Sequence, residues 1–168
     1  MATAFFSEES GPSGPGVTDE MVSRAELSLG VRLPSRYVAL LRERNGGVPA
    51  HRCFPLTRPT SWAPDHIEVS RLMGIGFDEG IDGELGSRYL IEEWGYPKVG
   101  IVIFETPSGG HDTVMLDYSN CGAQGEPMVV HVDEDRIPVL VAPTFAEFID
   151  GLVDCGTLAS KPTSSAAL

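Results

Sequence analysis

Apolar residues recur at helical spacing near the start of the chain. We expect a helix over residues 18–29, because Thr18 is a favourable N-cap and Gly30 can adopt the left-handed conformation that ends a helix. Asp19 and Glu20 lie in its first turn, where the helix dipole favours acids. The apolar face of this helix comprises Met21, Val22, Ala25 and Leu29.

A second helix follows after a short connection. Pro34 fits its first turn, and the run Asn45-Gly46-Gly47 ends it. Its apolar stripe consists of Tyr37, Leu40 and Leu41. The two helices are expected to form a short hairpin.

Two more helices are expected further along the chain. Residues 87–94 form a short one with Ser87 as its cap. Near the C-terminus, Thr144 and Glu147 make a capping box. The helix that this box begins carries an apolar stripe of Phe145, Phe148, Ile149 and Leu152.

The middle of the chain has the pattern of strands. Residues 99–105 are a continuous apolar run of the kind that is buried on both faces of a sheet, and a turn at 106–110 joins this run to the next strand in a hairpin. Residues 137–142 fit either a strand or an extended connector. The strands are expected at 67–75, 99–105, 111–118 and 128–132.

Three segments have no regular pattern. Residues 1–16 are rich in glycine, proline and polar side chains and are expected to be a flexible N-terminal segment, and the tail at 156–168 is expected to be disordered. Residues 48–66 are irregular and contain four prolines. Trp62 in that segment is interpreted as a plug over the core, with a binding role as the alternative.

Charge is distributed unevenly along the chain. The formal net charge is -12, from 24 acidic and 12 basic side chains. Residues 1–64 carry a net charge of +1 and residues 65–168 a net charge of -13. Such a surface repels nucleic acid and anionic membranes and steers basic proteins toward it. Neither nucleic acid nor membrane is therefore expected as a partner.

The cysteines and histidines give no positive case for a metal or a cofactor. Cys53, Cys121 and Cys155 are widely spaced and are interpreted as free thiols in a reducing compartment. The first ten residues lack a basic region followed by an apolar core, so a cytoplasmic location is expected. The loop at 76–86 holds four glycines and four acids but matches neither a calcium loop nor a phosphate cradle.

Catalytic motifs are likewise absent from the sequence, and no enzyme activity is expected. His131 lies in an apolar strand, where a structural imidazole is the default. The best polar group is His111, Asp112 and Asp117, but a strand directs Asp112 away from the other two. Asp112 is expected to bond to the adjacent glycine turn and Asp117 to pair with a neighbouring base. An enzyme that uses His111 and Asp112 remains a third hypothesis.

Taken together, these residues resemble the SMI1/KNR4 domain of the SUKH superfamily over roughly residues 17–153. An inserted His111 and the proline-rich stretch at 48–66 depart from the family pattern. The resemblance is carried most clearly by Leu33, Pro34, Tyr37, Asn45, Gly46, Gly47, Gly110, Asp112, Asp117 and Tyr118.

This resemblance implies an α+β fold, with an N-terminal helical hairpin and a C-terminal helix packed on a mainly antiparallel sheet, in a single domain at 17–155. It also implies no cofactor and no enzymatic activity. Bacterial members are typically immunity proteins that bind and block a polymorphic toxin, often a nuclease or deaminase. Fungal relatives act as adaptors in signalling. The motif residues would be mainly architectural, and the acidic remainder would carry function.

Our first hypothesis is therefore an immunity protein with a basic toxin domain as its partner. The second is an intracellular adaptor that binds host signalling proteins around Trp62. Acids in exposed turns are the candidate contacts, because they imitate the charge of a nucleic-acid substrate. They are Asp78, Glu79, Asp82 and Glu84 in one loop and Asp133, Glu134 and Asp135 in another.

Overall fold

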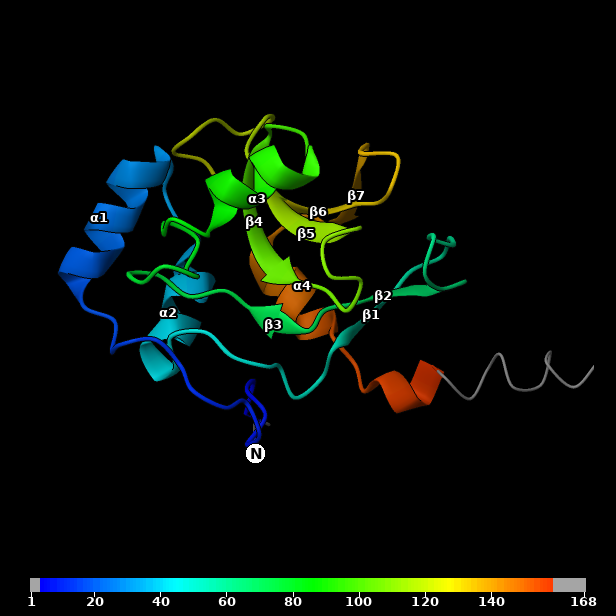
Figure 1. Cartoon of the computed structure of the whole chain (residues 1–168). Coiled ribbons are helices and arrows are strands. Elements are labelled where there is room, and N and C mark those ends of the chain that lie inside the picture. Colours follow the sequence, from blue (N-terminus) through cyan, green and yellow to red (C-terminus); the bar gives the residue numbers. More distant parts are fainter. Residues whose placement is uncertain (1–3, 159–168) are drawn as a thin grey trace, which may run out of the picture.

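A five-stranded antiparallel sheet lies at the centre of the protein (Figure 1). The computed structural model describes residues 4–158, so most of the expected tail at 156–168 lies outside the described residues. Neighbouring strands follow the order of the chain, which makes the sheet a simple meander. Its strands are β3 (Arg71–Leu72), β4 (Gly100–Glu105), β5 (Thr113–Asp117), β6 (Met128–Val132) and β7 (Pro138–Ala142).

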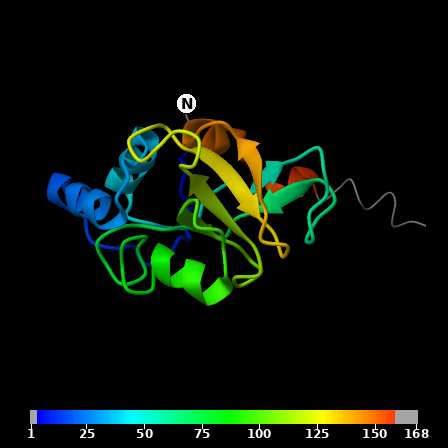
Figure 2. The same ribbon diagram turned by 90° about the horizontal axis from the view of Figure 1, so that it is seen from above.

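Helices cover both faces of this sheet, which confirms the α+β fold. In Figure 2 the sheet lies between α3 on one side and α4, with α2 beside it, on the other. A separate two-stranded sheet pairs β1 (Cys53–Pro55) with β2 (His66–Glu68). The helices are α1 (Asp19–Leu29), α2 (Ser35–Glu43), α3 (Ser87–Trp94) and α4 (Phe145–Gly151).

Aromatic rings join α2, α4 and the central strand β4. The Tyr37 and Phe145 rings meet edge-on at 5.6 Å between centroids, and Phe104 lies 5.5 Å from Phe148. All four side chains are fully buried. Aromatic pairs of this kind add to the energy of area burial. The apolar stripes predicted for the second and the last helix therefore form one core.

The predicted helix caps are confirmed at two of three helices. The Thr18 hydroxyl accepts a hydrogen bond from the Met21 amide, and the Thr144 hydroxyl accepts one from the Glu147 amide. The prediction for Ser87 is wrong, because Gly86 is the N-cap of α3. Ser87 is instead buried, and its hydroxyl accepts a hydrogen bond from the backbone amide of Val102 in β4.

Two strand predictions need correction. The segment at 67–75 is not one strand, because its two ends join different sheets: β2 pairs with β1, and β3 pairs with β4. The segment at 137–142, which was open between strand and connector, contains β7 and pairs with β6. Strands β4, β5 and β6 lie within their predicted ranges, whereas β1 lies in the stretch at 48–66 that was predicted to be irregular.

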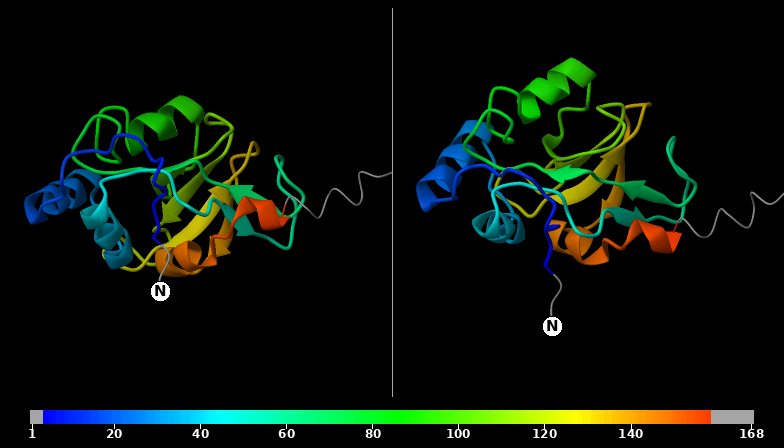
Figure 3. Two further views of the ribbon diagram at one scale, coloured as in Figure 1. Left: turned by 90° about the horizontal axis from the view of Figure 1, so that it is seen from below. Right: turned by 60° about the horizontal axis from the view of Figure 1, so that its bottom comes forward.

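The N-terminal segment, for which flexibility is predicted, contacts the rest of the domain from residue 4 onward. Ser7 donates a backbone hydrogen bond to Val48, and the Ala50 amide donates to Phe5. Ser10 is buried and bonds to both backbone groups of Val48. Figure 3 shows this segment crossing the connection that leads from α2 to β1. The composition of this segment could not predict these backbone contacts.

Asn45 joins this N-terminal segment to the core. Its side-chain amide nitrogen donates to the carbonyls of Pro15 and Ile75, and its side-chain oxygen accepts from the Ile75 amide. Gly46 follows at a φ of 92°, a conformation that favours glycine. A Cβ on Gly74 would lie 2.4 Å from the Asn45 side-chain oxygen. Asn45, predicted to end the second helix, thus also links the end of this helix to the backbone at Pro15 and at Ile75.

Cys53 and Cys155 form a disulfide, so the expectation of free thiols is wrong for these two residues. Their Cα atoms are 5.1 Å apart although 102 positions separate them in the chain. Backbone hydrogen bonds between Cys53 and Val153 hold the two segments together, and residues 155–158 form a helical turn that buries Leu158. Cys121 is free and exposed. The spacing of the cysteines in the sequence could not show that Cys53 and Cys155 are close. Because they form a disulfide, the cysteines no longer support the expected reducing compartment.

The structure contains no candidate membrane span within residues 4–158, because none of their helices combines the necessary length and apolar character.

Candidate functional site

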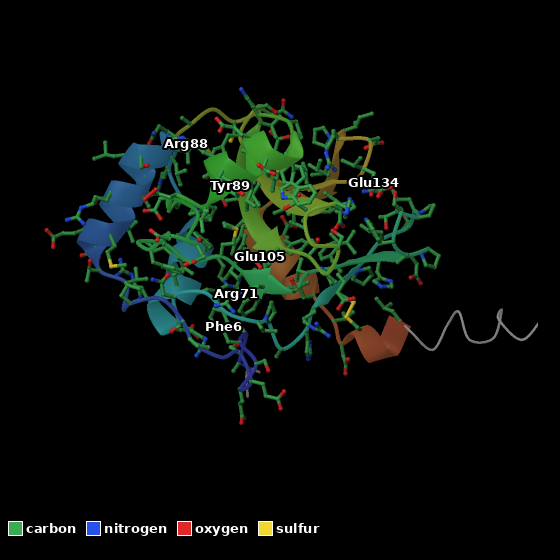
Figure 4. The ribbon with its side chains drawn as sticks, viewed as in Figure 1. Phe6, Arg71, Arg88, Tyr89, Glu105 and Glu134 are labelled. Atoms are coloured by element: carbon green, nitrogen blue, oxygen red, sulfur yellow. A yellow bond between two sulfur atoms is a disulfide. The ribbon has the colours of Figure 1, made fainter. Side chains whose placement is uncertain are left out.

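Three connections meet at one end of the central sheet. They are the β1–β2 connection at 56–65, the β4–β5 connection at 106–112 and the β6–β7 turn at 133–137. In Figure 1 the β6–β7 turn lies above the tip of the β1–β2 hairpin, on the right of the view, and Figure 4 labels Glu134 there. We call this surface the loop platform. It comprises Trp62, Trp94, His111, Asp133, Glu134, Asp135 and Arg136.

Asp133 connects two of these loops. Its carboxylate accepts hydrogen bonds from the backbone amides of Ser61, at 2.8 Å, and Glu134, at 2.9 Å. Partial burial raises the pKa of Asp133, but these hydrogen bonds outweigh it and leave the pKa below its ordinary value. The charged carboxylate therefore fixes the loop that presents Trp62.

An aromatic row crosses the platform. The His111 ring lies between two indoles, 6.2 Å from the Trp62 centroid and 5.5 Å from the Trp94 centroid. Trp62 is 50% exposed, so the prediction of a plug over the core is wrong. The alternative, a binding role for Trp62, remains open. Neither Trp94 nor His111 was singled out for binding from the sequence, because contact between them arises only in the fold.

Arg136 holds the platform together by donating hydrogen bonds to the backbone carbonyls of other residues. Its guanidinium donates to the carbonyls of Trp94, His111 and Asp133, and it lies 5.0 Å above the Tyr96 ring. Its own φ of 63° closes the tight acidic turn. Because its donors are directed at these acceptors, the neighbouring carboxylates of Glu134 and Asp135 stay exposed to solvent.

The second group of predicted acids lies elsewhere. Asp78, Glu79, Asp82 and Glu84 belong to the loop before α3, which Figures 1 and 2 place at the opposite end of α3 from the β6–β7 turn. Within this loop the Asp82 carboxylate accepts from the Gly76 amide, and Asp78 accepts a backbone bond from Leu85. The structure thus separates the two acidic groups that the sequence proposed together.

A cleft of about 230 Å³ lies between these two acidic regions. Glu79 and Leu85 contribute to it from the loop before α3, and Trp94 and Gly110 contribute from the platform side. At its edge, partial dehydration raises the pKa of Glu105, nearby Arg71 lowers it, and Glu79 raises it further, with a net upward shift. The cleft therefore joins the platform to the second acidic loop.

Buried polar groups support the platform from below. The Asp112 carboxylate accepts hydrogen bonds from the Thr106 and Ser108 hydroxyls and lies 2.7 Å from the His131 ring nitrogen. Burial raises the pKa of Asp112, but these hydrogen bonds lower it below its ordinary value overall. The expected bond from Asp112 to the glycine turn is replaced by this network. The structural role expected for His131 is confirmed.

Asp117 also differs from expectation. Within residues 4–158 it pairs with no base, and it accepts hydrogen bonds from the backbone amide and hydroxyl of Ser119 at the end of β5. The next residue, Tyr118, donates its hydroxyl proton to the Arg32 carbonyl in the connection between α1 and α2. Both residues therefore fasten the end of the hairpin to its surroundings.

His111 and Asp112, the pair of the enzyme hypothesis, do not converge. His111 is exposed against the indole rings, whereas Asp112 is buried and faces His131. The one group of three metal-ligand side chains within residues 4–158 is Cys53, Glu68 and Cys155, in which the two sulfurs are bonded to each other. The described geometry therefore does not bring His111 and Asp112 together at one site.

The comparison with known families agrees with this architecture. The model of the SMI1 / KNR4 family (SUKH-1) matches residues 16–151. The chain belongs to the SMI1/KNR4 family. No curated protein matches the sequence.

Several residues that carry the SMI1/KNR4 resemblance have roles in the fold. Leu33 and Tyr37 are buried, and the Tyr37 hydroxyl donates to the Met73 carbonyl at 2.6 Å. Pro34 stands at the N-cap of α2. Gly110 has a φ of 118° and packs so closely on Trp94 that a Cβ would clash with the indole. Of these family positions, Gly110 contacts the platform through Trp94, and Tyr37 bonds to Met73, which lines the cleft.

Proposed function

We propose that this SMI1/KNR4 protein is a non-enzymatic immunity protein that binds the basic surface of a toxin domain through the loop platform. The observation that carries this proposal is the exposed Trp62, whose loop is bonded by Asp133 to the turn that exposes Glu134 and Asp135. Tryptophan anchors are frequent hot spots of protein interfaces, and flanking charges steer association. A toxin that acts on nucleic acid presents a basic surface of the complementary sign.

Rigidity of the platform supports a binding role. Each of its loops is held by a hydrogen bond to a neighbouring loop or helix: Asp133 to the Ser61 amide, and Arg136 to the carbonyls of His111 and Trp94. A surface that is already ordered loses less conformational entropy on association. The acids therefore add to the binding free energy without a large ordering cost.

The test measures inhibition of a toxin domain encoded beside the gene. The purified protein is expected to block the toxin's activity and to bind with a rate that falls with salt. The variant Glu134→Lys/Asp135→Lys should lower the association rate by about tenfold and flatten its salt dependence. The matched control is Glu20→Lys/Glu43→Lys, which makes the same charge change at exposed positions of α1 and α2.

The outcomes test both the contact surface and the immunity role. Equal losses in the platform variant and its control would reject the platform as the contact surface. A wild-type protein that neither binds nor inhibits the neighbouring toxin, but binds purified signalling proteins through Trp62, would replace the immunity role with the adaptor role.

A further inference from the structure

The cleft beside the platform has apolar depth and an acidic edge. Phe104 and Val102 at its base are almost fully buried, Trp94 and Leu90 are half-buried, and Glu79 and Glu105 are exposed. Figure 4 shows Glu105 on the same face as Tyr89 of α3 and Arg71 of β3. Its volume of about 230 Å³ lies below the usual range of small-ligand pockets, about 300–1,000 Å³, and suits one inserted side chain.

The two glutamates at the cleft edge have no close ion-pair partner within the described residues. Glu105 and Glu79 raise the local negative potential, and Arg71 is the cation that acts on Glu105. The Arg71 guanidinium, however, donates to the Pro12 carbonyl. Within residues 4–158, no ion pair of 4.0 Å or less joins either glutamate to a cation. The edge thus has carboxylate oxygens to offer to a cation from a partner.

From these features we infer that the cleft receives an arginine side chain of the bound partner. This inference rests on the proposed function and names the anchor of that same interface. The guanidinium stacks on the Trp94 ring while its N–H groups bond to Glu105 and Glu79, and the methylene stem covers Leu90. Arginine fits better than lysine, because its planar cation stacks on aromatic rings and sheds water more readily.

The chain offers a direct probe of this site. Trp62 and Trp94 are its two tryptophans, and because Trp94 lines the cleft and Trp62 does not, their indole N–H signals distinguish the cleft from the loop of Trp62. Acetyl-Gly-Arg-Gly-amide is titrated to a concentration on the order of 10 mM, the scale expected for a single anchor residue. The Trp94 signal should shift saturably and the Trp62 signal should stay in place. Trp62→Phe assigns the two signals.

Matched peptides and variants define the chemistry. The citrulline peptide, a neutral isostere of arginine, should bind at least about tenfold more weakly. Glu105→Gln should weaken binding of the arginine peptide at least about threefold, whereas Glu20→Gln, at an exposed position of α1, should leave it unchanged. Leu85→Arg places an arginine at the cleft edge and should abolish peptide binding by occupying it. Thermal unfolding confirms that each variant is folded.

The results separate this inference from the proposed function. An unmoved Trp94 signal, an equal response to citrulline, or parallel shifts of both indoles would overturn the arginine site even if the toxin is inhibited. A saturable shift of Trp94 alone, lost in Glu105→Gln and Leu85→Arg, would support it even if the tested toxin does not bind, in which case the immunity role would be at fault.

Discussion

The His131 ring nitrogen Nε2 lies 2.7 Å from the Asp112 carboxylate, and both side chains are almost completely buried between β6 and the start of β5. The same carboxylate accepts from Ser108 in the β4–β5 connection. A loop residue is thereby bonded to the middle of the sheet. The position of His111, one residue before Asp112, depends on this buried pair.

Asp112→Asn should destabilise the protein by about 1–3 kcal/mol, because an amide cannot replace all the hydrogen bonds that the buried carboxylate makes with Thr106, Ser108 and the His131 ring. Urea denaturation at neutral pH measures this loss. The matched control Asp135→Asn changes an exposed acid in the β6–β7 turn and should stay within about 0.5 kcal/mol of wild type. Equal stability of the two variants would contradict the role given to the pair.

The contribution of Asp112 should also depend on pH. Its folded-state pKa is lower than its ordinary value, so the stabilisation is fully present above the unfolded pKa of about 3.9 and is lost as pH falls through the folded pKa. The free-energy difference between wild type and Asp112→Asn should therefore shrink below about pH 4. Denaturation at a series of pH values checks this, and a constant difference down to pH 3 would oppose it.

Loss of the disulfide should lower the unfolding free energy by about 2–5 kcal/mol, since the bond closes a long loop in the unfolded chain. Cys53→Ser/Cys155→Ser is compared with Cys121→Ser, which changes the free and exposed cysteine. Thermal unfolding should show a large drop for the first variant and almost none for the second. Addition of dithiothreitol should affect wild type but not the double variant.

Asn45→Ala should cost about 2–4 kcal/mol, because the buried Ile75 amide and carbonyl both lose their side-chain partner. Amide exchange at Gly14, whose N–H bonds to the Asn45 carbonyl, should accelerate as the N-terminal segment loosens. Asn120→Ala, at an exposed position, is the control. Unchanged exchange at Gly14 would show that the side chain does not hold this segment.

Asp133→Asn should free the loop that carries Trp62 while the rest of the fold remains stable. The Ser61 amide, now bonded to the Asp133 carboxylate, should exchange faster with solvent by at least about fivefold. Glu134→Gln removes a neighbouring charge that accepts no bond from this loop and should leave the rate unchanged. Similar Ser61 exchange rates in both variants would show that Asp133 does not hold this loop.

The helices were predictable because their signals are local. Thr18 and Thr144 cap their helices through residues three positions away, and the stripes of α2 and α4 have helical period. The continuous apolar run of β4 and the turn after it were equally clear. Each of these signals lies within one turn or one hairpin, so the sequence pattern contains it completely.

Contacts between distant segments could not be predicted. The platform joins Trp62, His111 and Asp133 from three connections, and no periodicity relates such positions. Cys53 and Cys155 likewise meet only after the last helix has packed. The acids at 78–84 and 133–135 shared a composition but not a location, because charge content does not determine which loops are neighbours.

The disulfide between β1 and the C-terminal turn makes residues 53–155 a closed covalent ring. The platform and the cleft lie inside this ring, whereas α1 and α2 lie outside it. A protease that nicks an exposed loop such as 56–65 would therefore open the ring without releasing a fragment, and both new ends would stay tethered. While the disulfide is oxidised, a single cut within residues 53–155 would leave two polypeptides that remain covalently joined as one molecule.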